Sequence, residues 1–358
     1  MKTLFITSTR EYCGKTLVAL GLGKKLQADG FKVGYMKTLG MFPTTIGGMV
    51  IDSDASVVYE VLGLKDAPEL ISPVIMTQDM IVQAYGGDDL KLDEKFVQAY
   101  KEVSKDKDVV IIEGTGLFGE GSLLGLSAHS LIEQLSASAI VIDNCKKEVF
   151  ADDLLMAKSI LGDKIIGIIL NQVELPKYDY IQRRVLPFME KNGLKVLGVL
   201  LNDPFLMSVT IRELAESLGG EIICCKHKQD ELVERFSVGA MNVEGALSYF
   251  RKIRSKAVIT GGDRGDIQLA ALETNTQCLI LTGNLYPNDV IIAMAEEREV
   301  PIMVVRSDTL TVVQRVEDIM STMRIRDMRK IDRAVQLVND EVNFSLLYEL
   351  LKLKDSSV

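Results

Sequence analysis

The residues best suited to phosphate chemistry stand near the start of the chain, in Gly14, Lys15 and Thr16. A short apolar run at residues 4–6 precedes them, and apolar residues at helical spacing follow over residues 17–26. Backbone N–H groups at a helix N-terminus point at phosphate oxygens, and the helix dipole favours negative charge. In such a Walker A loop the lysine would reach the β and γ phosphates, and the threonine would hold Mg²⁺. A plain strand-to-helix turn with a solvated lysine is the alternative, but the position at the first strand-to-helix junction favours the phosphate loop.

The loop departs from the pattern G-x-x-x-x-G-K-[ST] at Thr9, where the first glycine is expected. Because threonine lacks the freedom of glycine at positive φ, a modified loop geometry is predicted. Cys13 lies inside the loop and is predicted to line the nucleotide site. A helix N-terminus can lower a thiol pKa and make it redox-sensitive. The simpler interpretation is a small loop residue.

Four further candidates stand at or near the ends of predicted strands, where α/β sheets bind ligands. Glu113 ends an apolar run and precedes Gly-Thr-Gly, so we predict that it binds Mg²⁺, with a capping carboxylate as the alternative. Asp54 is a second candidate Mg²⁺ ligand, or else a helix N-cap. Lys37 could bind a second anionic group or be a solvated strand-end lysine. Asn171 could contact a base edge or simply form a turn.

A second possible anion site lies at Gly261, Gly262, Asp263 and Arg264, between a predicted strand and a predicted helix. Asp263 or Asp266 could cap that helix, and Arg264 could pair with a phosphate or carboxylate. The alternative is a tight structural turn with an intramolecular Asp–Arg pair.

An alternation of strands and helices must position these residues. Continuous apolar runs, rather than alternating ones, indicate buried parallel strands. In the first part, strands are predicted at 3–6, 31–37, 108–113, 139–143, 165–171 and 196–200, and helices at 17–26, 57–62, 92–103, 130–135, 151–161 and 178–191. In the second part, strands are predicted at 221–224, 257–260, 278–281 and 302–305, and helices at 211–218, 242–250, 266–273, 288–296 and 310–322.

This alternation predicts an α/β protein with a doubly wound parallel sheet, followed by a smaller α/β unit. Residues 1–204 are expected to form the nucleotide-binding domain and residues 205–323 the second domain. A charged helical tail at 324–358 is expected to pack on the rest or to mediate dimerisation. Residues 40–48 are expected to form a loop, and residues 65–92 to wrap irregularly over the sheet.

Composition narrows the function classes. The net charge of −9 over 358 residues argues against nucleic acid or an anionic membrane as the main partner. Five cysteines without C-x-x-C spacing and two histidines make a zinc site, a disulfide framework or a histidine-based triad unlikely. No signal peptide or membrane-length apolar run is found in the sequence, so a cytoplasmic protein is expected.

The first domain resembles dethiobiotin synthetase and the related cobyrinic acid a,c-diamide synthases. The matching stretches are FITSTREYCGKT, VGYMKTLG, DSDA, VVIIEGTG and IILNQV. The resemblance implies that Lys15 and Thr16 bind ATP phosphates and that Lys37 contacts substrate and phosphate. It also implies that Asp54 and Glu113 bind Mg²⁺ and that Asn171 contacts adenine, leaving ATP favoured over GTP by analogy only. Thr38 stands where the synthetase has proline, which bears on substrate handling.

The whole chain resembles the N-terminal regulatory region of long bacterial phosphate acetyltransferases, in which a DRTGG domain follows the ATPase-like domain. The stretches at residues 238–241, 256–270 and 281–287 carry this second resemblance. No acetyltransferase catalytic domain follows them in the sequence, so acetyltransferase activity is not expected of this chain by itself.

The leading hypothesis is therefore a homodimeric ATP- and Mg²⁺-binding regulatory protein whose second domain senses a small ligand or a partner. Any hydrolysis would rest on charge stabilisation by Lys15 and Mg²⁺. The alternative is an ATP-dependent carboxylate-activating ligase, with Lys37 positioning the substrate. A third hypothesis is a structural subunit whose loop has lost its nucleotide, as Thr9 suggests.

Overall fold

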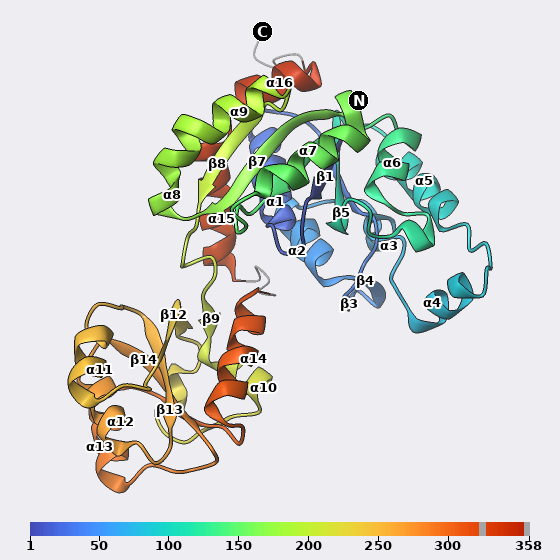
Figure 1. Cartoon of the computed structure of the whole chain (residues 1–358). Helices are drawn as coiled ribbons and strands as arrows, with labels where there is room; N and C mark the ends of the chain where they lie inside the picture. The colour runs from blue at the N-terminus through green and yellow to red at the C-terminus, as the bar shows by residue number, and fades with distance from the viewer. Residues whose placement is uncertain (322–326, 354–358) are drawn as a thin grey trace. The chain divides into compact units, whose positions relative to one another are not determined.

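The computed structural model describes residues 1–321 and 327–353 (Figure 1). The chain divides into two compact units, residues 1–202 together with 325–358, and residues 203–324. The described part of the C-terminal segment thus packs within the first unit. The domain limits expected from the sequence stay predictions. No helix among the described residues is long and apolar enough to cross a membrane.

The first unit is built on a six-stranded sheet in which all neighbouring strands run parallel. Its strands, in spatial order, are β2 (Val33–Lys37), β5 (Val109–Leu117), β1 (Lys2–Ser8), β6 (Ser138–Asp143), β7 (Ile165–Val173) and β8 (Val196–Leu201). The first strand of the chain therefore lies in the middle of the sheet, with β5 and β2 on one side of it and β6, β7 and β8 on the other. Ligand-binding crevices of open α/β sheets form at the carboxyl ends of strands where the order reverses in this way.

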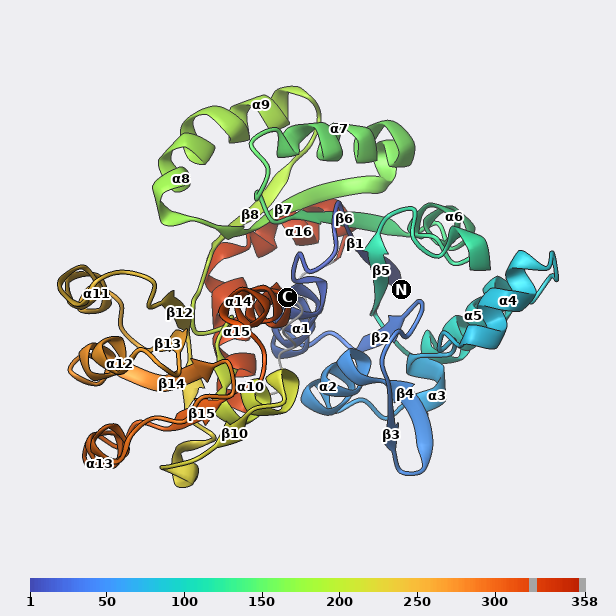
Figure 2. The same ribbon diagram turned by 60° about the horizontal axis from the view of Figure 1, so that its bottom comes forward.

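Helices cover both faces of this sheet (Figure 2). Alternate residues of a strand face opposite ways, so Phe5, Val110 and Ile112 share one buried core with α5, α6 and α7. On the other face α15 packs against α1 so closely that a Cβ on Gly21 would lie 2.3 Å from Val338 Cβ. The helices of this unit are α1 (Lys15–Ala28), α2 (Ser53–Leu62), α3 (Pro68–Ile71), α4 (Gln78–Tyr85), α5 (Leu92–Val103), α6 (Ala128–Gln134), α7 (Phe150–Leu161), α8 (Leu175–Tyr180), α9 (Leu186–Lys191), α15 (Met328–Glu341) and α16 (Phe344–Leu351).

Two local differences from the sequence-based elements have physical causes. The expected loop at 40–48 contains a hairpin of β3 (Pro43–Ile46) and β4 (Met49–Asp52). Its turn is Gly47-Gly48, and both residues have positive φ. Two-residue hairpin turns favour positive φ, so the Gly-Gly pair is a sequence signal for this hairpin. The expected helix at 178–191 is interrupted by a π-helical turn, Ile181–Val185, just before Pro187, which has no N–H to donate.

The second unit has a five-stranded sheet in the order β10 (Glu221–Ile222), β15 (Ile302–Val304), β14 (Thr276–Thr282), β13 (Lys256–Gly261) and β12 (Arg235–Val238). All pairs are parallel except β10 with β15. One face packs on α10 (Ile211–Leu218) and α14 (Thr309–Ser321), and the other on α11 (Val243–Phe250), α12 (Gly265–Leu272) and α13 (Asp289–Glu297). A two-stranded pair, β9 (Val209–Thr210) with β11 (Leu232–Val233), completes the unit. The predicted α/β class, with a doubly wound parallel sheet and a smaller α/β unit, is confirmed.

Candidate functional site

The loop between β1 and α1 ends at Gly14, whose φ of 85° lies in the left-handed region. A Cβ at this position would lie 2.3 Å from the side-chain amide nitrogen of Asn171. That nitrogen donates a hydrogen bond to the carbonyl oxygen of Cys13 at 2.8 Å. Both the backbone angle and the lack of space therefore require glycine here. Asn171, at the end of β7, is brought to the loop from 158 residues away.

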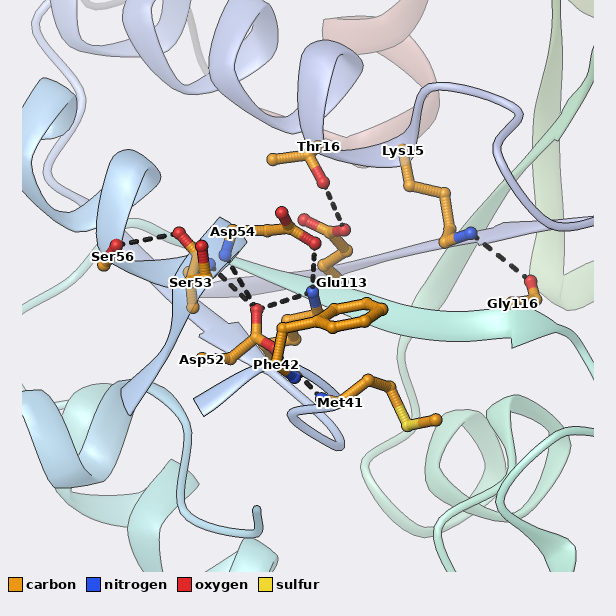
Figure 3. Close-up of polar contacts among 12 residues, drawn as sticks. Lys15, Thr16, Met41, Phe42, Asp52, Ser53, Asp54, Ser56, Glu113 and Gly116 are labelled. Atoms are coloured by element: carbon orange, nitrogen blue, oxygen red, sulfur yellow. Dashed lines mark hydrogen bonds and ion pairs between the residues drawn. The ribbon is translucent and has the colours of Figure 1, made fainter. Parts of the chain in front are cut away.

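Lys15 and Thr16 begin α1 and point toward the carboxyl edge of the sheet (Figure 3). The Lys15 ammonium donates to Ser8 Oγ at 3.1 Å and to the Gly116 carbonyl oxygen at 3.4 Å. Burial lowers the pKa of Lys15, and the charge of Glu113 opposes that shift. Thr16 Oγ1 donates to Glu113 Oε1 at 2.7 Å. The two residues predicted to bind phosphate and Mg²⁺ thus lie beside polar groups of β1 and β5.

Glu113 is a buried carboxylate on β5 that accepts two hydroxyl hydrogen bonds. One comes from Thr16, and the other comes from the buried Tyr35 hydroxyl at 2.8 Å. Burial raises the pKa of Glu113, because a charge in a dry environment loses its hydration. The parallel register of β2 and β5 sets Lys37 opposite Glu113. The strand register, rather than sequence proximity, therefore brings these groups together.

Lys37 is held by two carboxylates that follow β4. Its ammonium lies 2.7 Å from Asp52 Oδ1 and 2.9 Å from Asp54 Oδ2. Burial alone would lower the pKa of Lys37, but the charges of Glu113, Asp54 and Asp52 outweigh burial and raise it. Lys37 is therefore a buried, neutralised cation in this structure, and not a solvated strand-end lysine.

Asp52 is a residue that the sequence analysis missed. It is fully buried, caps α2 by accepting from the Asp54 and Ala55 N–H groups, and accepts from the Met41 and Phe42 N–H groups at 2.9 and 3.0 Å. The N-cap role considered for Asp54 thus belongs to Asp52. An aspartate directly before a helix was the signal that could have identified it.

Thr9 lies at a position where no glycine is needed. The positive φ values in the loop fall on Tyr12 and Gly14, and Thr9 is not among the described residues with left-handed backbone. Its hydroxyl donates to the carboxylate of Asp143, a buried residue at the end of β6. Arg10 pairs with Asp153, and its guanidinium also lies 4.0 Å from Asp143. This polar anchoring replaces the conformational freedom that the first glycine would give.

Cys13 is buried beneath the loop and its thiol does not have the properties of a reactive cysteine. Burial, followed by the charge of Asp143, raises the pKa of the Cys13 thiol, although Lys15 acts in the opposite direction. The lowered thiol pKa considered from the sequence is therefore not found, because the desolvation cost exceeds the effect of the nearby cation.

The donors gathered here suit a hard divalent cation. Thr16 offers a hydroxyl, and Glu113 and Asp54 offer carboxylates, and Mg²⁺ prefers oxygen ligands. No group of three or more His, Cys, Asp or Glu side chains that could hold a metal is found within residues 1–321 and 327–353. In phosphate-binding proteins Mg²⁺ is usually held by one or two carboxylates together with phosphate oxygens and water.

The residues of the second candidate site form a tightly packed turn. A Cβ on Gly262 would lie 2.2 Å from the carbonyl oxygen of Leu285, so no other residue fits there without movement. Arg264 forms an ion pair with Asp266, at 3.0 Å, and also donates to the Met241 carbonyl oxygen. The Asp–Arg pair considered from the sequence therefore exists, and Asp266 is its acid. Gly261 and Asp263 stay predicted ligand residues.

Comparison with known families identifies both units. Residues 2–210 match the family described as AAA domain, and residues 213–319 match the DRTGG domain. The chain is 22% identical to a phosphate acetyltransferase of Synechocystis sp., over 98% of this chain and 52% of that protein. It is 25% identical to an ATP-dependent dethiobiotin synthetase of Methanococcus vannielii, over 59% of this chain and 98% of that protein. The resemblance predicted from the sequence is thereby confirmed.

Two facts limit what these similarities imply. The chain spans about half the length of the phosphate acetyltransferases that it matches. A solved structure of the MinD cell division protein of Aquifex aeolicus aligns with 57% of this chain and 84% of that chain, at 13% identity and a TM-score of 0.36. A TM-score this low says nothing about function.

Proposed function

The chain belongs, through residues 2–210, to the family described as AAA domain, and on that premise we propose that it is a regulatory protein that binds ATP with Mg²⁺. One observation carries the proposal: Lys15 and Thr16, at the N-terminus of α1, lie beside Glu113 at the carboxyl edge of the sheet. A cation, a hydroxyl and a carboxylate in this arrangement, at the N-terminus of a helix, suit a phosphate with its metal ion.

Each residue has a defined role in this proposal. The backbone after Gly14 and the Lys15 ammonium would hold the phosphates, and Thr16 and Glu113 would hold Mg²⁺. The metal would supply neutralisation of the phosphate charge. Asp54 could bind the metal only if it gave up part of its ion pair with Lys37. Any turnover would depend on Lys15, which is the cation nearest to the loop backbone among these groups.

A regulatory role is supported by the second unit, which matches the DRTGG domain. Lys37 is neutralised by Asp52 and Asp54, so it could hold a second anion only after exchanging partners. We therefore propose that the nucleotide acts as an effector and that the whole chain responds to its binding. The expected assembly is a homodimer.

A second candidate is supported by one comparison. Similarity to an ATP-dependent dethiobiotin synthetase extends over 98% of that protein. A carboxylate-activating ligase would use the same site, with Lys37 released from its carboxylates to position an acid beside the γ phosphate. It requires that ADP formation depend on a specific acid or amine.

The test is calorimetric titration of ATP, ADP and GTP, with and without Mg²⁺, followed by measurement of phosphate release. Wild type is compared with Lys15→Ala and with Lys24→Ala, a lysine on the same helix for which no ion pair is found among the described residues. We expect ATP–Mg²⁺ binding in wild type and Lys24→Ala, at least about tenfold weaker binding in Lys15→Ala, and little turnover. Absence of nucleotide binding in wild type would overturn the proposal, and acid-stimulated turnover would support the ligase.

A further inference from the structure

The second unit contains a cavity of about 430 Å³ at the carboxyl edge of its sheet. Its polar lining comes from Glu221, Asn284, Tyr286, Arg306, Ser307 and Arg315. Glu221 begins β10, which runs antiparallel to β15, so it lies at the end where β15 finishes. Asn284 and Ser307 follow β14 and β15. The cavity thus occupies the place where α/β sheets bind small molecules, and its volume is typical of such sites.

The backbone fixes the shape of this cavity. Gly283 N donates to the Ser307 carbonyl oxygen at 2.9 Å, and Asn284 N donates to the Val305 carbonyl oxygen at 2.9 Å. These bonds tie together the two loops that leave β14 and β15. Gly283 and Asn284 both have positive φ, at 82° and 56°, which turns the chain sharply over the cavity. The site is therefore pre-formed rather than dependent on one mobile loop.

The Gly-Gly pair after β13 supports the same loop from behind. The absence of a side chain on Gly262 lets the carbonyl oxygen of Leu285 approach, because a Cβ there would lie 2.2 Å away. Gln268 is fully buried and its amide donates to the Gly261 and Gly262 carbonyl oxygens at 3.1 and 3.0 Å. The Gly261–Gly262 pair therefore has a packing role, because it lets residues 284–286 lie close to the end of β13.

The charges that line the cavity are unbalanced. Arg306 and Arg315 are exposed, and within residues 1–321 and 327–353 no ion pair with either guanidinium is found. The one carboxylate in the lining, Glu221, accepts a hydrogen bond from the Tyr286 hydroxyl at 3.0 Å. Two guanidinium groups against one carboxylate leave a local positive charge in a chain whose net charge is −9. Guanidinium groups bind phosphate through paired hydrogen bonds.

We propose that this cavity is the small-ligand site of the second unit and that it binds a phosphorylated molecule through Arg306 and Arg315. Ser307 supplies a hydroxyl beside the phosphate, and the exposed ring of Tyr286, oriented by Glu221, packs on the rest of the ligand. The inference deepens the proposed function, on which it rests, by assigning the site and the chemical class of the second effector. It also moves the expected ligand contact from Arg264, which is paired with Asp266, to Arg306 and Arg315.

The full chain is titrated by calorimetry with AMP and with inorganic phosphate, and with malate as a carboxylate probe. The test variant is Arg306→Gln/Arg315→Gln, and the matched control is Arg298→Gln, an exposed arginine outside the cavity. Lys15→Ala is titrated in parallel, to exclude binding at the first unit. Thermal unfolding checks that the variants fold, which is expected because the replaced side chains are exposed.

We expect wild type, Arg298→Gln and Lys15→Ala to bind AMP equally, within about twofold, and the double arginine variant to lose at least about tenfold in affinity. No binding of AMP or phosphate to wild type would overturn the inference. The inference would also be overturned if only Lys15→Ala lost AMP binding, or if the double variant bound AMP as wild type does. Binding of malate by a wild type that does not bind inorganic phosphate would overturn it as well. ATP–Mg²⁺ titration separates the two proposals: normal ATP–Mg²⁺ binding by wild type with no AMP binding rejects this inference and leaves the proposed function standing, whereas normal ATP–Mg²⁺ binding by the double variant with loss of AMP binding supports it.

Discussion

The amide nitrogen of Asn171 occupies the space that a side chain at Gly14 would need, 2.3 Å from an ideal Cβ, while it donates to the carbonyl oxygen of Cys13. One hydrogen bond from β7 thus fixes the last turn of the loop before α1. The amide of Asn171 thus shapes the loop. Contact of this residue with a base, which the family resemblance implies, stays a prediction.

Replacing Gly14 by alanine is expected to destabilise the protein and to abolish nucleotide binding. The left-handed backbone costs an L-residue about 1–2 kcal/mol, and displacing the Asn171 amide adds the loss of a buried hydrogen bond, about 1–3 kcal/mol. Gly87→Ala is the matched control, because Gly87 has φ 89° but open space around it. Urea unfolding and ATP titration measure both effects. Equal losses of stability in the two variants would show that the contact with Asn171 is unimportant.

Restoring the usual first glycine, by Thr9→Gly, is expected to weaken the protein by about 1–3 kcal/mol. The substitution removes the hydroxyl that donates to Asp143 and leaves that buried carboxylate short of a donor. Thr9→Ser keeps the hydroxyl and should retain most of the stability. Urea unfolding of the three proteins is the measurement. If Thr9→Gly were more stable than wild type and bound ATP more tightly, Thr9 would be a substitution that impairs the loop, and not an anchor of it.

Glu113→Gln tests the metal role without disturbing the packing. The amide oxygen can still accept from Thr16, and the amide nitrogen can donate to the Tyr35 oxygen, so the stability change is expected to stay within about 1 kcal/mol. The increase in ATP affinity that Mg²⁺ produces should disappear. Titrations with and without Mg²⁺ measure that increase, with the exposed Glu102→Gln as control. An unchanged Mg²⁺ effect would place the metal elsewhere.

Lys256 gives the second unit a defined pH dependence. It is buried at the start of β13, where its ammonium donates to the Ile253 and Asn275 carbonyl oxygens and to Thr274, and desolvation lowers the pKa of Lys256 to about 8. Between that value and the ordinary lysine value the unfolded chain binds more protons than the folded one. The contribution of this residue to stability is therefore lowest below pH 8 and rises as the pH increases above it.

Lys256→Met is expected to remove that rise. The stability of wild type relative to the variant should increase by about 1–3 kcal/mol between pH 7.5 and 10, while the exposed Lys252→Met should follow wild type. Urea unfolding at four pH values measures the difference, in which titrations shared by both proteins cancel. Parallel pH profiles of wild type and Lys256→Met would contradict the depressed pKa.

Helix α15 packs closely against α1 within the first unit. Gly21→Ala would normally stabilise a helix by about 1 kcal/mol, but here the added methyl would lie 2.3 Å from Val338 Cβ, so we expect a net loss of about 1–3 kcal/mol. Adding Val338→Ala should recover part of that loss, because it removes the two Cγ methyl groups that would lie 2.6 Å from the added carbon. A double-mutant cycle measured by urea unfolding gives the coupling. Additive effects would show that the two helices do not press on one another.

Local sequence determined the elements and the chemistry at their ends. Continuous apolar runs such as residues 109–112 predict buried parallel strands, and the Gly14-Lys15-Thr16 run at a strand-to-helix junction predicts an anion-binding turn, because both signals lie within a few neighbouring residues. For these features periodicity and turn chemistry are sufficient. The same local pattern predicted a strand that ends at Glu113, whereas β5 continues to Leu117, because residues 114–117 extend along the neighbouring strand β1.

Tertiary structure alone decided which of these groups meet. Thr16 and Glu113 are 97 residues apart, and Thr9 and Asp143 are 134 apart, and only the strand order β2-β5-β1-β6 brings their ends together. The capture of Lys37 by Asp52 depends on the β3–β4 hairpin, and the cavity with Arg306 and Arg315 depends on the pairing of β10 with β15. A sequence read along the chain carries no direct record of strand order, because non-local pairing is selected by the packing of the whole core.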